Sequence, residues 1–166
     1  EFYDGNRNYG YGGFNYDGRW LSIAKNMCRE YNLDSQSSVL QVGCDKGFLL
    51  NDFLQVHSEM KVRGTEISNY PIENAMDSVK SYIQKAPFTQ LPFTDGEFDF
   101  VIAIGPVYSL NLGDAIQCLK EIQRVSKGKS FITLGSYIDE DSFRLFRYWT
   151  LLGATILHEE EWVEVL

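Results

Sequence analysis

Ser38-Val-Leu-Gln-Val-Gly-Cys-Asp-Lys-Gly-Phe48 is the stretch that decides the fold of this chain. An apolar strand pattern runs directly into a turn that carries Gly43 and Gly47, and a helical pattern follows from Leu49 to Leu54. In an open α/β sheet, such a turn presents backbone N–H groups and the positive helix end to a polar or anionic ligand. The stretch therefore predicts a strand, a glycine turn and a helix around a ligand site.

A second strand pattern follows over residues 61–68 and places Glu66 near its end. In nucleotide-binding α/β folds, a carboxylate about 20 residues beyond the glycine turn binds the ribose hydroxyls. The glycine turn and Glu66 together predict a bound nucleoside.

The remainder of the sequence alternates between strand and helix patterns, which is typical of a parallel sheet with helices on both faces. The predicted strands are Val39–Val42, Val62–Glu66, Phe100–Ile104 and Ser130–Leu134, with a short additional strand considered at Phe88–Thr89. The predicted helices are Trp20–Tyr31, Phe48–Val56, Pro71–Ile83, Leu112–Val125 and Asp141–Leu152. The predicted fold class is therefore α/β, Rossmann-like and mostly parallel.

The length of 166 residues favours one domain, with a Tyr/Gly-rich segment over residues 1–20 and an α/β core over residues 21–166. Glycines interleaved with aromatic residues from Tyr9 to Trp20 suit a lid over the ligand, and the alternative is a tail packed on the sheet. The acidic segment Glu159–Leu166 indicates a helix with no closing strand after it, so the fold is expected to lack its C-terminal strands here.

Composition excludes several classes of function. The chain has 15 Lys and Arg against 23 Asp and Glu, a net charge of −8 that disfavours a nucleic-acid partner. No window approaches the roughly 20 apolar residues of a membrane span, and the start lacks a secretory pattern, so a cytoplasmic location without membrane contact is expected. The three cysteines are scattered without CxxC spacing, which argues against a disulfide framework or structural metal.

The stretch Val39–Gly47 resembles the first motif of class I S-adenosylmethionine-dependent methyltransferases. Three more segments, in the right order, resemble later parts of that family: the strand end at Glu66, the run Leu91–Ile102, and the run Cys118–Ile132. The resemblance extends over most of the chain. It implies S-adenosylmethionine as cofactor, a methyltransferase activity and a methyl acceptor as partner.

The resemblance also implies roles for individual residues. The first motif supplies Gln41, Gly43, Cys44, Asp45 and Gly47 around the methionine part of the cofactor. Glu66 would accept hydrogen bonds from both ribose hydroxyls, Ile67 and Phe88 would flank the adenine, and Ile104 would line the floor near the reactive methyl group. Such catalysis is largely positioning of an activated methyl group, so no catalytic residue is assigned.

Three positions depart from the family pattern and keep an alternative open. Gln41 stands where an acid is usual, Asp45 where a glycine is common, and Pro87 where an adenine-contacting Asp is common. The leading hypothesis is a methyltransferase acting on a small molecule, such as a metabolite or sugar derivative. The alternatives are a non-catalytic binding domain of the same fold and, less favoured, an NAD-dependent oxidoreductase, whose turn would need glycines at positions 45 and 48.

Other candidate residues have simpler structural interpretations. Asp99 is interpreted as a turn or capping residue, and His57 and His158 as structural histidines rather than general bases. The run Glu159–Glu161 is interpreted as a solvated helix start, and no metal site is predicted.

Overall fold

A computed structural model describes residues 15–166, and a parallel five-stranded sheet forms its centre. The strand order is β3-β2-β1-β4-β5, so the chain runs outward from β1 in one direction and then returns past it to β4 and β5. The strands are β1 (Ser38–Val42), β2 (Lys61–Glu66), β3 (Ile83–Lys85), β4 (Phe100–Ala103) and β5 (Ser130–Ile132). The predicted α/β class with a parallel sheet is confirmed.

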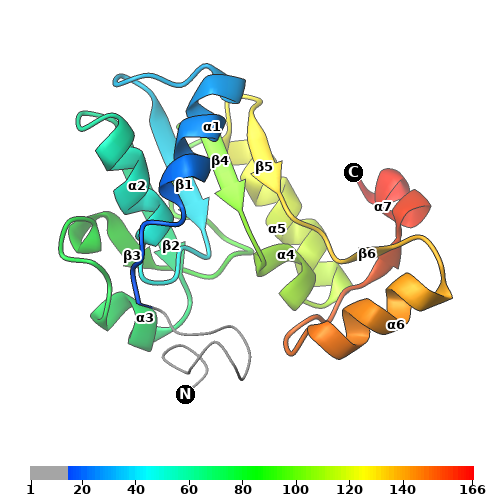
Figure 1. Cartoon of the computed structure of the whole chain (residues 1–166). Helices are drawn as coiled ribbons and strands as arrows, with labels where there is room; N and C mark the ends of the chain where they lie inside the picture. Colours follow the sequence, from blue (N-terminus) through cyan, green and yellow to red (C-terminus); the bar gives the residue numbers. More distant parts are fainter. Residues whose placement is uncertain (1–14) are drawn as a thin grey trace.

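Helices cover both faces of this sheet (Figure 1). On one face, α1 (Leu21–Tyr31) and α2 (Phe48–Val56) bury side chains such as Phe53 against the sheet. On the other face, α5 (Leu112–Val125) buries its apolar stripe. Because both faces are covered, the residues of β1 and β4 are almost all buried, which explains the continuous apolar run of β4 and the mostly apolar sequence of β1.

The chain after β5 forms a small unit beyond the edge of the sheet, where Figure 1 shows α6 and α7 on either side of β6. Two short parallel strands, β6 (Ser136–Tyr137) and β7 (Leu157–His158), precede α6 (Glu140–Trp149) and α7 (Glu159–Val165) respectively. The two strands were not predicted. The predicted C-terminal helix is confirmed as α7.

The predicted long helix Pro71–Ile83 is wrong. The structure has a short α3 (Asn69–Glu73), then turns, then the single 3-10 turn η2 (Lys80–Tyr82). The backbone N–H of Met76 donates to the carbonyl of Lys46 at 3.0 Å, which ties the turns to the glycine loop instead of to a continuing helix. A tertiary hydrogen bond thus overrides the local helical pattern.

The short strand considered at Phe88–Thr89 is also wrong, because those residues lie in a turn. The edge strand lies a few residues earlier, as β3, where Ile83 pairs with Gly64 of β2. Two other predictions run too long: β5 ends at Ile132, and α6 ends at Trp149. After α6, the Gly153 N–H donates to Thr150 Oγ1 at 2.8 Å and closes a turn.

Between residues 15 and 166, no helix has the length and apolar character needed to cross a bilayer.

Candidate functional site

The turn after β1 is built from three left-handed backbone positions. Gly43 has φ +68°, Asp45 +49° and Gly47 +78°. The N–H groups of Gly43 and Cys44 both donate to the carbonyl of Thr65, at 2.9 and 3.0 Å, which fastens the turn to the end of β2. A left-handed conformation favours glycine, and a short polar residue such as Asp tolerates it best among the others.

Gly43 is required for a second reason. A Cβ at this position would overlap Cγ of Pro106, the first residue of α4 (Pro106–Ser109). The turn after β1 and the turn after β4 are therefore in direct contact. They meet at the point where the strand order reverses, which is where open α/β sheets bind ligands.

Glu66 ends β2 and connects its carboxylate to the glycine turn. Its Oε2 accepts a hydrogen bond from the Asp45 N–H at 3.1 Å, and its Oε1 accepts from the N–H groups of Ile67 at 2.8 Å and Ser68 at 3.1 Å. The side chain is only 4% exposed. A carboxylate has about four acceptor positions, so one remains for a donor in the neighbouring cavity.

A cavity of about 430 Å³ lies at this carboxyl edge of the sheet. Six of the predicted site residues line it, namely Gly43, Asp45, Glu66, Ile67, Phe88 and Ile104. The other lining residues are Ser68, Gly105, Pro106, Tyr108, Ser109, Thr150 and Leu152. The prediction that the glycine turn and Glu66 border one pocket is confirmed.

Three predicted site residues lie outside the cavity lining. Cys44 is buried beneath the turn, where a Cβ on Gly64 would lie 2.6 Å from its Sγ, and burial raises the pKa of its thiol well above the ordinary value. Gly47 packs against Val79, which a Cβ there would meet at 2.6 Å. Gln41 is buried within β1, and its Oε1 has no hydrogen-bond partner among the described residues.

Asp45 is the unusual charge in the cavity. Burial and the neighbouring Glu66 carboxylate raise its pKa to about 7, although Lys46 acts in the opposite direction. Asp45 and Glu66 are the only charged side chains that line the cavity within residues 15–166, and no Lys, Arg or His of that range does so. The cavity therefore offers acceptors and a titratable acid but no fixed positive charge.

The far wall of the cavity comes from residues that the sequence did not point to. Tyr108 and Ser109 belong to α4, and Thr150 and Leu152 follow α6. Tyr108 joins the two segments: its ring meets Phe146 of α6 edge-on at 5.7 Å, and its carbonyl accepts from the N–H groups of two residues that follow α6. The one available signal was the Gly-Pro pair directly after the fourth strand.

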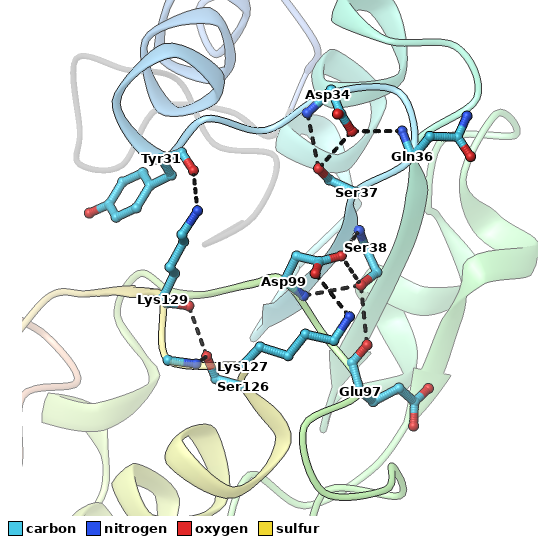
Figure 2. A network of polar contacts seen from close by, with 11 residues as sticks. Tyr31, Asp34, Gln36, Ser37, Ser38, Glu97, Asp99, Ser126, Lys127 and Lys129 are labelled. Atoms are coloured by element: carbon cyan, nitrogen blue, oxygen red, sulfur yellow. Dashed lines mark hydrogen bonds and ion pairs between the residues drawn. The ribbon is translucent and has the colours of Figure 1, made fainter.

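The opposite, amino edge of the sheet holds a network of polar contacts around one ion pair, shown in Figure 2. Asp99 Oδ2 accepts from the backbone N–H of Ser38 at 2.8 Å and from its hydroxyl at 2.7 Å, while Oδ1 binds Lys127 Nζ at 2.9 Å. Partial burial opposes the effect, but these hydrogen bonds lower the Asp99 pKa to about 2. Asp99 is a structural residue, as predicted from its place at a turn.

The two histidines and the acidic run also lie away from the cavity lining. His57 follows the last residue of α2, and His158 caps α7 by accepting from the Glu160 N–H at 3.3 Å. The run Glu159–Glu161 forms the first turn of α7. Among residues 15–166, no group of three or more His, Cys, Asp or Glu side chains is arranged to hold a metal ion.

Only the end of the predicted lid can be described, because residues 1–14 of the Tyr/Gly-rich segment lie outside the described residues. Tyr16 contacts α2: its hydroxyl donates to Asp52 Oδ1 at 2.5 Å and accepts from Gln55 Nε2 at 2.6 Å. Its ring meets Phe48 edge-on, with centroids 5.7 Å apart. The chain entering α1 is thus held beside the helix that follows the glycine turn.

Comparison with known families gives a match to a model described as "Methyltransferase domain", over residues 40–134. These residues are more than half of the chain. Comparison with curated protein sequences finds no significant relative.

Solved structures with this fold are similar only at low sequence identity. YcgJ from Bacillus subtilis is 17% identical, with a TM-score of 0.67, over 90% of this chain and 66% of that one. A SAM-dependent methyltransferase from Aquifex aeolicus is 22% identical, with a TM-score of 0.54, over 68% and 63%. The [4+2]-cyclase SpnF is 17% identical, with a TM-score of 0.70, over 99% and 60%. This chain therefore spans less than two thirds of each.

Proposed function

The chain belongs to the methyltransferase domain family, and on that premise we propose that its cavity binds S-adenosylmethionine and delivers the methyl group to a small-molecule acceptor. The observation that carries the proposal is the meeting of the Gly43 turn and the Glu66 carboxylate in one cavity at the carboxyl edge of the sheet. Ligands of open α/β sheets bind at this edge, where the strand order reverses.

The residues present fit the cofactor in its nucleoside half. Glu66 keeps an acceptor position free for a ribose hydroxyl and is held in place by three backbone N–H groups. Ile67 and Phe88 offer apolar surfaces for the adenine, with Ile67 49% exposed and Phe88 6% exposed. Gly43 and Asp45 form the wall beside which the methionine half would lie.

When bound, S-adenosylmethionine supplies a methyl group already activated by a sulfonium centre. The task of this chain is then to orient the acceptor and exclude water. Ile104, Pro106 and Tyr108 would form a largely apolar wall on the acceptor side, and Ser109 beside them donates its hydroxyl to the Pro106 carbonyl at 2.7 Å. We assign no side chain as a general base.

The negative charge of the chain and of the cavity lining supports a small-molecule acceptor. The chain carries a net charge of −8, and the charged side chains that the described residues place in the cavity lining are acidic, so a phosphate backbone would meet repulsion throughout. The proposal therefore includes neither a nucleic-acid partner nor a membrane partner. A cytoplasmic location is the corresponding proposal from composition.

A second candidate is a binding module of the same fold without methyl transfer. The observation that favours it is Asp45, whose carboxylate occupies the glycine turn and would face the carboxylate of the cofactor's methionine. Gln41 and Pro87 are further departures from the family pattern. On this hypothesis the cavity still binds a nucleoside, so binding and turnover must be measured separately.

Isothermal titration calorimetry with S-adenosylhomocysteine tests the proposal. Glu66→Ala should weaken binding by about 1.5–3 kcal/mol, the range for hydrogen bonds to a charged group, which is roughly 10- to 150-fold in affinity. Glu59→Ala is the matched control, because Glu59 is an exposed acid near the opposite end of β2. Parent-like binding by Glu66→Ala would refute the ribose-binding role of Glu66.

Two further titrations separate the alternatives. NAD binding in preference to S-adenosylhomocysteine would favour an oxidoreductase. Tight S-adenosylhomocysteine binding without methyl transfer to any acceptor in a metabolite panel would favour the binding module. Because Glu66 also anchors the glycine turn, thermal unfolding of Glu66→Ala must show that the variant is folded.

A further inference from the structure

The cavity is small for two ligands. Its volume of about 430 Å³ lies in the lower part of the range of roughly 300–1,000 Å³ seen for small-molecule sites. A nucleoside cofactor with its methionine part takes most of that space. Only the reacting end of an acceptor then fits inside, and the rest of the acceptor must lie on the rim.

That rim is apolar and exposed. Thr150 and Leu152 line the cavity, and the neighbouring side chains carry a large apolar surface that faces solvent. Tyr148 is 87% exposed, Leu151 71% and Leu152 61%. Large apolar side chains with so much exposed surface, close together in sequence, are unusual in folded proteins and point to a binding surface. We call Tyr148, Leu151 and Leu152 the rim patch.

Packing among residues 15–166 leaves the rim patch largely exposed. None of the residues of α6 is buried, and ring contacts between the helix and the rest of residues 15–166 run from Phe146 to Tyr108 and from Phe143 to Tyr137. These contacts leave most of the Tyr148 surface exposed to solvent. Figure 1 shows α6 beyond the sheet edge and beside α4, the helix that brings Tyr108 to the cavity.

Charge restricts the occupant further. The cavity lining contains two carboxyl groups, Asp45 and Glu66, and no basic side chain among the described residues. An acceptor with a phosphate or carboxylate near its reacting end would meet like charge and no counter-ion. On α6 itself, Arg144 is paired with Glu140 at 2.7 Å, and the second cation of the helix, Arg147, is not part of the cavity lining.

We propose that the methyl acceptor is an uncharged molecule with an extended apolar part, whose reacting end enters the cavity while the apolar part lies along the rim patch. This inference rests on the proposed function. Continuity is its main support, because Leu152 belongs both to the cavity lining and to the exposed patch. A second copy of the chain and a lipid surface are the competing occupants.

A series of 4-alkylphenols of increasing chain length tests the inference, titrated calorimetrically into protein saturated with S-adenosylhomocysteine. Each added methylene should raise affinity about three- to four-fold once the chain reaches the rim patch. The variant Tyr148→Ser/Leu151→Ser should abolish this rise and leave the binding of 4-methylphenol unchanged. Val163→Ser on α7, which removes another highly exposed apolar side chain, is the control and should keep the rise.

The outcomes separate this inference from the proposed function. Failure of S-adenosylhomocysteine to bind would refute the proposed function itself. Normal S-adenosylhomocysteine binding with a flat alkylphenol series overturns only the apolar acceptor. Stronger binding of a 4-alkylbenzoate than of the phenol of equal length overturns the uncharged acceptor.

Two measurements address the competing occupants. If Tyr148→Ser/Leu151→Ser converts a dimer to a monomer in light scattering without changing the alkylphenol series, the rim patch is an interface between copies. If it abolishes co-sedimentation with phosphatidylcholine vesicles and leaves the series unchanged, the patch binds lipid surfaces. Either result overturns the acceptor assignment.

Discussion

The two edges of the central sheet use carboxyl groups in opposite ways. At the amino edge, Asp99 accepts hydrogen bonds from Ser38 and Lys127, and its pKa falls to about 2. At the carboxyl edge, burial and Glu66 raise the pKa of Asp45 to about 7. At the amino edge the carboxylate is already hydrogen-bonded and ion-paired, whereas the carboxyl edge keeps a protonatable acid beside a cavity.

This difference distinguishes the two edges more clearly than the presence of charge does. Both edges are hollowed, since a second cavity of about 300 Å³ at the amino edge is lined by Ser38, Asp99 and Lys127 among others. There, however, the acid Asp99 is already paired. A half-buried acid with a raised pKa beside a cavity, as Asp45 is here, is a candidate for a site that a ligand would complete. Variants at the two edges test this contrast.

The largest effect is expected for Gly43→Ala at the carboxyl edge. The new Cβ would overlap Pro106 Cγ, and the backbone φ of +68° is unfavourable for alanine. Left-handed strain of about 1–2 kcal/mol and overpacking of about 1–3 kcal/mol should together lower the free energy of unfolding by roughly 2–5 kcal/mol. Chemical denaturation measures the loss, and titration should show weaker S-adenosylhomocysteine binding because Pro106 is displaced.

Gly96→Ala provides the control for Gly43→Ala. Gly96 also has a left-handed φ, +61°, but a Cβ there would meet no atom of residues 15–166 within 4 Å. Gly96→Ala should lower the free energy of unfolding only by the cost of the left-handed backbone strain, with unchanged ligand binding. Equal losses in the two variants would contradict the close contact between the two turns.

A smaller effect is expected for Asp99→Ala at the amino edge. The change leaves the Ser38 N–H and Lys127 without this acceptor, so the free energy of unfolding should fall by about 1–3 kcal/mol. Affinity for S-adenosylhomocysteine should stay at the parent value. Asp95→Ala, at an acid that is 82% exposed in its ion pair, should cost less than about 1 kcal/mol. A loss of ligand affinity in Asp99→Ala would contradict the proposal that the ligand binds at the carboxyl edge independently of the amino edge.

The two acids should give opposite pH dependence of stability. The lowered pKa of Asp99 gives stability that is present above pH 4 and is lost as pH falls towards 2. The raised pKa of Asp45 gives the opposite pH dependence. The contribution of Asp45 to the free energy of unfolding is fully present below pH 4 and is lost as pH rises through 7.

Asp45→Asn isolates that second dependence. Asparagine tolerates the left-handed backbone at this position and carries no charge, so the variant should be more stable than the parent at pH 8, on the order of 1–2 kcal/mol, and equal to it near pH 4. Denaturation series at several pH values measure this. Asp77→Asn, at an exposed acid, is the control, and identical profiles for Asp45→Asn and the parent would contradict the raised pKa.

The smallest effect is expected for Tyr16→Phe. The variant loses the hydroxyl that donates to Asp52 and accepts from Gln55, while the ring contact with Phe48 remains. Loss of one partly exposed hydrogen bond should cost about 0.5–1.5 kcal/mol. If the segment is a lid, hydrogen exchange near Tyr16 should slow when S-adenosylhomocysteine binds, in the parent more than in Tyr16→Phe.

Much of the fold was predictable because its signals are local. The apolar run of β1, the glycine turn and the amphipathic stripe of α5 each reflect one repeating pattern, and α2 and α5 have the predicted bounds. The region around α3 was not predictable, since a hydrogen bond from Met76 to Lys46, which is distant in sequence, replaces the continuing helix.

The candidate site, like the fold, was predictable only in part. Spacing located Gly43 and Glu66, but it could not show which side chains of the turn face the cavity. Cys44 and Gly47 pack into the core because the backbone alternates through left-handed positions. Tyr108 and Leu152 were missed because their place in the wall depends on the chain's return after α6.

None of the residues of α6 is buried, so this helix is under weak constraint from packing during evolution. Substitutions at exposed positions usually change stability by less than about 0.5 kcal/mol. This helix can therefore accumulate changes that the sheet, with its buried strands and constrained turn, would not tolerate. One fold can thus vary at its periphery while the strands and the glycine turn beside the cavity are preserved.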